Sequence, residues 1–230
     1  MPLRALLKRI ESRALLIWFA LAASVWAFLG VAGEMAEGDL TGFDRRILLA
    51  LRAPGHPADP IGPKWFGEAM RDLTALGGVA VLTLLVLATL LILIFHRKRR
   101  QALVFGLTMA ATFASSELLK QAYNRPRPDL VPHASYVYSA SFPSGHSTLS
   151  AATYLTLATV IASLEPQRAT KVLIYVLAVL VVMGVGFSRI YLGVHWPSDV
   201  LAGWALGSAW AFVAWIGLSR LVRPAGDPLF

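Results

Sequence analysis

The chain has 230 residues, of which 57% are hydrophobic and only 15% are charged, whereas an average soluble domain carries about 25% charged residues. This composition excludes a soluble globular protein. The absence of cysteine excludes disulfide frameworks, thiol nucleophiles and cysteine-based metal sites. The net charge of +8 does not indicate a nucleic-acid partner, because basic residues that flank apolar segments usually record membrane topology.

Six apolar segments are each long enough to cross the hydrocarbon core, which takes about 20 residues. They cover residues 14–32, 74–95, 102–119, 145–164, 172–190 and 199–219. Small polar residues interrupt the third segment, and such residues commonly mark helix contacts in a membrane bundle. The first segment exceeds the 7 to 15 apolar residues of a signal peptide, so we expect a retained span. The sequence predicts an all-α polytopic membrane protein with six transmembrane helices, in one membrane-embedded domain over 1–230.

The distribution of lysine and arginine predicts the orientation of these spans. With a cytoplasmic N-terminus, the inner connections hold twelve of the 21 cations and three of the 13 acids, as the positive-inside rule requires. The basic run from His96 to Arg100 is the sharpest marker. We expect a multi-pass protein of the inner or plasma membrane with both termini in the cytoplasm.

A polar stretch of some 40 residues separates the first two segments. Thr41 to Asp44 resembles a capping box with Asp at its fourth position, and residues 45–52 mix apolar and cationic side chains as an interfacial helix does. A helix at the membrane surface and a packed loop are equally compatible with this pattern.

Three groups of ionisable residues lie at span ends, and the charge-derived topology places all three on the outer face. They are Lys120 with Arg127-Pro128, then Pro143-Ser144-Gly145-His146, and then Ser188-Arg189 with His195 and Asp199. Three fixed cations suit a phosphate. No carboxylate cluster of metal-ligand type accompanies them, so the cations themselves must neutralise the anion and no metal or other cofactor is expected.

The same residues suggest roles in catalysis. Pro143-Ser144-Gly145 opens a helix, whose free N–H groups attract anions, and Gly145 lets the backbone approach a phosphate closely. Pro197 suits the first turn of the last span and places Asp199 within side-chain reach of His195. A histidine held by a carboxylate presents its other nitrogen as a nucleophile or base, and His146 could protonate the leaving oxygen.

In order, spacing and residue type, the three groups resemble the three-part signature of the type 2 phosphatidic acid phosphatase superfamily, which also includes vanadium haloperoxidases. Residues 72–77 resemble the family less specifically. The resemblance implies a six-helix core and a metal-independent phosphatase that forms a phosphohistidine on His195. It also implies that Asp199 assists His195 and that His146 is the acid. The implied phosphate-binding residues are Lys120, Arg127, Ser144, Gly145 and Arg189.

Two nearby ionisable residues fall outside the signature. Arg125 either contacts a second phosphate or faces solvent, and we favour solvent. Glu117 is expected to be a structural partner rather than a catalyst.

An outward-facing site at helix ends favours a lipid phosphate, whose tails stay in the bilayer. We expect undecaprenyl diphosphate first, followed by phosphatidylglycerophosphate or phosphatidate. Two alternatives that use the same site are a lipid phosphotransferase and a lipid A phosphatase, and a third is a non-catalytic lipid-phosphate binder. Soluble haloperoxidase chemistry would gain nothing from six spans. The sequence does not specify an oligomeric state.

Overall fold

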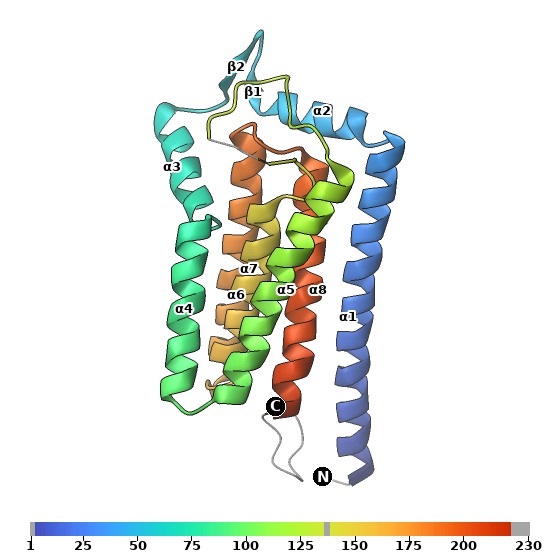
Figure 1. Ribbon diagram of the computed structural model, residues 1–230, viewed down its shortest axis with the longest axis vertical. Coiled ribbons are helices and arrows are strands. Elements are labelled where there is room, and N and C mark those ends of the chain that lie inside the picture. Colours follow the sequence, from blue (N-terminus) through green and yellow to red (C-terminus); the bar gives the residue numbers. More distant parts are fainter. Residues whose placement is uncertain (1–2, 136–138, 222–230) are drawn as a thin grey trace.

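Six long helices lie side by side in the computed structural model, which describes residues 3–135 and 139–221 (Figure 1). The long helices are α1 (Leu3–Glu37), α4 (Val79–Phe95), α5 (Arg99–Tyr123), α6 (Gly145–Ala162), α7 (Arg168–Tyr191) and α8 (Pro197–Leu221). The shorter elements are α2 (Thr41–Ala50), α3 (Lys64–Ala75) and an antiparallel hairpin of β1 (Arg52–Ala53) and β2 (His56–Pro60). The hairpin is a small departure from the all-α prediction.

Each predicted apolar segment lies in this helical framework, but the second is not one helix. It runs from the end of α3 through α4, and these two helices are bent by 41°. The break contains Gly77, where a Cβ atom would collide with Val185 on α7 and lie 3.3 Å from the Cβ of His146. A residue without a side chain at this position lets α6 and α7 lie this close to the break.

Four of the described helices are long and apolar enough to cross a membrane, or five when α3 and α4 count as one bent span. They are α5, α7, α8 and the part of α1 from Ala14 to Glu37. These helices make the chain a multi-pass membrane protein. α6 is not among them, because its polar side chains lower its hydropathy. Most of its serine and threonine side chains are buried, and the helix packs against α5, α7 and α8. The count of six spans stays a prediction.

α6 and α8 are packed unusually closely. On α8, a Cβ atom at Gly203 would lie 2.8 Å from the carbonyl oxygen of Ser144, and one at Gly207 would lie 2.7 Å from the Cβ of Ala151. Two glycines four residues apart let helix backbones approach each other in a membrane. This contact holds the start of α6 against the start of α8.

The two ends of the bundle carry different helix ends and connecting segments. α5 and α7 end, and α6 and α8 begin, at the end covered by α2 and the hairpin (Figure 1). The basic turn between α4 and α5, the turn between α6 and α7 and the start of α1 lie at the opposite end (Figure 1). All three groups of predicted site residues therefore lie at one end, away from the basic turn.

Candidate active site

Asp199 is the most highly connected group at this end of the bundle. Its side chain is fully buried in the first turn of α8. One carboxylate oxygen accepts hydrogen bonds from the His195 Nδ1 at 3.3 Å, the Trp196 backbone N–H at 2.9 Å and the Ser141 hydroxyl. The other oxygen accepts from the Arg125 guanidinium at 2.6 Å. The bond to Trp196 caps the helix that carries Asp199, so the carboxylate is fixed by its own backbone.

His195 lies between α7 and α8 and is buried. Its Nε2 is 3.1 Å from the Arg127 guanidinium. Arginine can only donate, so Nε2 carries the lone pair and Nδ1 carries the proton shared with Asp199. Burial lowers the pKa of His195 to about 4, although the hydrogen bond and charge of Asp199 raise it, and Arg127 and Arg189 lower it further. The imidazole is therefore neutral at physiological pH, with its lone pair turned toward a cation.

Two of the predicted phosphate-binding cations are held by the loop before α6. Arg127 donates to the Ser139 carbonyl at 2.8 Å and to the Val194 carbonyl at 2.6 Å. Lys120, in the last turn of α5, lies 2.9 Å from Glu117 and 3.4 Å from the Ser139 hydroxyl. The contact with Glu117 fits the expected structural partner.

Arg189 is the third cation and lies almost fully buried at the end of α7. Its guanidinium donates to the Thr74 hydroxyl of α3 at 3.0 Å. Among the described residues, its Nε has no hydrogen-bond partner. A buried, unpaired donor on a cation is costly, and an anion at this position would satisfy it.

The start of α6 has the geometry expected of an anion-binding turn. Ser144 is the N-cap residue, and its backbone N–H donates to the Asp199 carbonyl at 3.0 Å. The Ser144 hydroxyl accepts a hydrogen bond from the Ser147 hydroxyl at 3.0 Å, so it is engaged within its own helix. At Gly145 a Cβ atom would lie 3.0 Å from the Lys120 ammonium. The missing side chain leaves space beside that cation.

His146 follows directly on α6 and is half-buried. Its imidazole interacts electrostatically with Arg189, His195, Lys120 and Arg127. The structure thus brings together all eight residues that the sequence predicts for the site. Among the described residues, no group of three His, Cys, Asp or Glu side chains could hold a metal ion.

Arg125 corrects an expectation from the sequence. It neither faces solvent nor is left free for a second phosphate, because its side chain is 14% exposed and joins two carboxylates. It lies 2.6 Å from Asp199 and 2.7 Å from Asp44 of α2, and its guanidinium covers the ring of Trp196.

Asp44 is the residue that sequence reasoning missed. It is buried, and it accepts hydrogen bonds from the backbone N–H of Ser198 at 2.8 Å and from the Ser198 hydroxyl at 2.6 Å. Asp44 therefore caps α8 from another helix, while the Thr41 hydroxyl bonds to Gly38 rather than forming a capping box. Residues 41–50 form a helix whose buried side packs against α8.

The sequence profile of the PAP2 superfamily matches residues 101–223. The chain belongs to the PAP2 superfamily. This match confirms the family resemblance predicted from the three motifs. The matched region contains every predicted site residue but neither Asp44 nor Thr74.

Curated relatives and solved structures agree with this assignment. Over 146 residues the chain is 36% identical to phosphatidylglycerophosphatase B of Bacillus subtilis, covering 62% of this chain and 70% of the relative. Over 131 residues it is 30% identical to undecaprenyl-diphosphatase of Sulfolobus acidocaldarius, covering 55% of this chain and 59% of the relative. A crystal structure of a transmembrane PAP2-type phosphatidylglycerolphosphate phosphatase from Bacillus subtilis superimposes with a TM-score of 0.79 at 29% identity, covering 89% of this chain and 98% of that one.

Proposed function

We propose that this PAP2 protein is a metal-independent lipid phosphatase that works through a phosphohistidine on His195. The observation that carries the proposal is the buried, neutral His195 held by Asp199, with its free nitrogen turned toward Arg127. Relatives named as phosphatases support the lipid phosphatase assignment.

In the first step, the Nε2 lone pair of His195 attacks phosphorus. The bond from phosphorus to the leaving oxygen breaks, and His146, whose protonated form the bound phosphate favours, donates its proton to that oxygen. The imidazole becomes positively charged as the P–N bond forms, and the Asp199 carboxylate stabilises this charge.

In the second step, a water molecule attacks the phosphohistidine. His146, now neutral, accepts a proton from the water, and the P–N bond breaks so that its electron pair returns to His195. Inorganic phosphate leaves, and both histidines regain their starting protonation states.

The cations supply the electrostatic stabilisation. Lys120, Arg127 and Arg189 neutralise the phosphoryl oxygens, and the backbone N–H of Gly145 adds a donor at a helix N-terminus. Arg127 bonds to His195 in the free protein, so it turns to the phosphate when the substrate enters. This release exposes the nucleophile only when an anion is present.

We further propose that residues 1–230 form one membrane-embedded domain with six crossings and cytoplasmic termini, in the inner or plasma membrane. The basic turn at residues 96–100 then lies inside and the site on the outer face. A lipid headgroup reaches such a site while its tails stay in the bilayer. We propose undecaprenyl diphosphate as the preferred substrate, followed by phosphatidylglycerophosphate or phosphatidate.

Three alternatives predict different outcomes. A phosphotransferase would pass the phosphoryl group to another lipid and release little free phosphate. A lipid A phosphatase is supported by a 32% identical relative named lipid A 1-phosphatase, from Rhizobium etli. A non-catalytic binder would tolerate the loss of His195.

The test follows phosphate release by detergent-purified protein from the three lipids and lipid A in excess EDTA. We expect release that persists in EDTA and disappears in His195→Ala. Release that stops in EDTA and returns with a divalent cation would contradict the metal-independent mechanism, and product without free phosphate would favour the phosphotransferase.

A further inference from the structure

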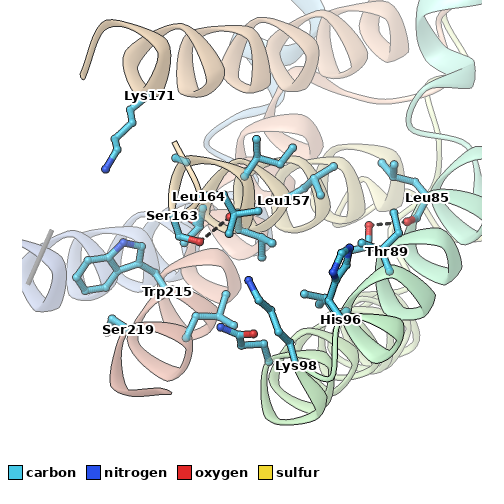
Figure 2. A pocket seen from close by; sticks show the side chains of 18 of the residues that line it. Leu85, Thr89, His96, Lys98, Leu157, Ser163, Leu164, Lys171, Trp215 and Ser219 are labelled. Atoms are coloured by element: carbon cyan, nitrogen blue, oxygen red, sulfur yellow. Dashed lines mark hydrogen bonds between the residues drawn. The ribbon is translucent and has the colours of Figure 1, made fainter. Parts of the chain in front are cut away.

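A cavity of about 620 Å³ lies at the end of the bundle opposite the candidate active site. Residues from α4, α5, α6, α7 and α8 line it, and no predicted site residue is among them (Figure 2). Its size is that of a site for a small amphiphilic molecule. The cavity is therefore a separate candidate binding site.

The walls of this cavity offer an occupant mainly hydrocarbon. Apolar side chains dominate them, including Leu85, Ile92, Leu157 and Leu218. The hydroxyls in the wall are already engaged: Thr89 donates to the Leu85 carbonyl, Ser163 to the Val160 carbonyl and Tyr175 to Thr159 (Figure 2). Since these donors are satisfied internally, the wall suits an acyl chain better than a polar ligand.

Basic groups surround the same cavity. His96 and Lys98 come from the turn between α4 and α5, and Lys171 comes from the first turn of α7 (Figure 2). No aspartate or glutamate is among the lining residues that the structure describes. Basic side chains beside an apolar wall complement an amphiphile with an anionic head.

We propose that this cavity binds one anionic glycerophospholipid. One acyl chain lies along the apolar wall between α4 and α6, and the headgroup phosphate lies at Lys98. The chemistry that selects the lipid is its negative charge together with its hydrocarbon tail. The proposal does not rest on the proposed function, because the two sites share no residue.

Native mass spectrometry of the detergent-purified full chain tests the proposal by titration with phosphatidylglycerol and with phosphatidylcholine of the same acyl chains. We expect phosphatidylglycerol to bind at least fivefold more tightly. Lys98→Gln should weaken its binding about fivefold, since one cation near a lipid surface has about that effect. Ala88→Trp, which fills the cavity from α4, should abolish binding.

Matched controls separate this site from other sources of binding. Arg100→Gln removes an exposed cation two residues from Lys98, and Leu87→Trp adds the same ring beside Ala88; neither residue lines the cavity. Both should leave binding unchanged. Equal binding of the two lipids, or equal weakening by Arg100→Gln and Lys98→Gln, would overturn the proposal.

A third control addresses the candidate active site, which could also hold a phosphate. Lys120→Gln should leave phosphatidylglycerol binding unchanged. If Lys120→Gln weakens binding while Lys98→Gln does not, the lipid occupies the candidate active site and the proposed cavity site is wrong. If Ala88→Trp fails to fold, as judged by its unfolding midpoint, the comparison of phosphatidylglycerol binding by Lys98→Gln and Arg100→Gln decides between the two sites.

Discussion

The Asp199 carboxylate accepts hydrogen bonds from four donors, three of them on one oxygen. An amide in the same place would have to turn its NH2 group either toward Arg125, which can only donate, or toward the side that holds His195 and the Trp196 backbone N–H. Replacement of this carboxylate therefore disturbs the tautomer of His195 as well as its charge.

At this position, Asp199→Asn should lower kcat for phosphate release by several orders of magnitude, as loss of the orienting carboxylate does in catalytic triads. His195→Ala should abolish turnover entirely, because no other group is placed to attack phosphorus. Size-exclusion profiles and unfolding midpoints should show that His195→Ala remains folded. A normal rate in either variant would contradict the proposed roles.

The burial of His195 also predicts the pH dependence. The pKa of this group lies near 4 rather than 6.5, and only the neutral imidazole can attack. The loss of kcat/KM that comes from protonation of this nucleophile should therefore be centred near pH 4 and not near pH 6.5. A decline centred on pH 6.5 would show that the nucleophile of the free protein is a solvated histidine instead.

At the scale of elements, Arg125 joins α2 to α8 through two buried carboxylates. Removing one partner of a buried ion pair leaves uncompensated charge and costs about 3 to 5 kcal/mol. Arg125→Ala should therefore lower the unfolding midpoint and the phosphatase rate together. Arg125→Lys should recover only part of the loss, because one ammonium cannot reproduce the bidentate fork.

The matched control is Arg71→Ala, which breaks the pair of Arg71 with Glu68 on α3. Both side chains are more than half exposed, and such surface pairs contribute about 0 to 1 kcal/mol. Its unfolding midpoint should be close to that of the unchanged chain. Equal decreases of the unfolding midpoint in Arg71→Ala and Arg125→Ala would show that the ion pairs of Arg125 stabilise the protein no more than an exposed pair does.

The close contact of α6 and α8 gives a second prediction for the elements. Gly207→Leu should force the two helices apart, because a Cβ atom there already overlaps the backbone of α6. Overpacking of this kind costs at least about 1 to 3 kcal/mol, and activity should fall because α6 and α8 carry His146 and Asp199. Gly30→Leu on α1 is the control, since nothing lies within 4 Å of a Cβ there; loss of activity in Gly30→Leu alone would contradict this account.

For the whole molecule, the proposed orientation is open to a direct test, because the chain contains no cysteine. A single cysteine at Asp59, in the hairpin, should react with an impermeant maleimide added to intact cells. A cysteine at Arg99, in the basic turn, should react only after the membrane is permeabilised. The reverse pattern would place the candidate active site in the cytoplasm.

Local sequence patterns predicted most of the helices and all three groups of site residues, because each group lies within a few residues of a helix end. They predicted the local partners, Asp199 for His195 and Glu117 for Lys120, but not the partners that lie far away in the sequence. The contact of Ser198 with Asp44 spans 154 residues, and that of Arg189 with Thr74 spans 115. No spacing rule reaches so far, although residues 72–77 already resembled the family.

As in the third predicted segment, small polar residues lower the hydropathy of α6. This helix lies among other helices, so its buried serines and threonines face protein and do not have to be apolar. The close packing at the Gly77 bend was also missed, because Val185, which lies against this glycine, is more than a hundred residues away.

The most direct test of the central claim is to trap the phosphorylated enzyme. Purified protein in excess EDTA would be mixed with undecaprenyl diphosphate, quenched in alkali to preserve phosphohistidine, digested and analysed by mass spectrometry. We predict one phosphoryl group on the peptide that contains His195, and none in His195→Ala. A phosphoryl group on another residue, or turnover in EDTA with no phosphorylated peptide at any time point, would contradict the account.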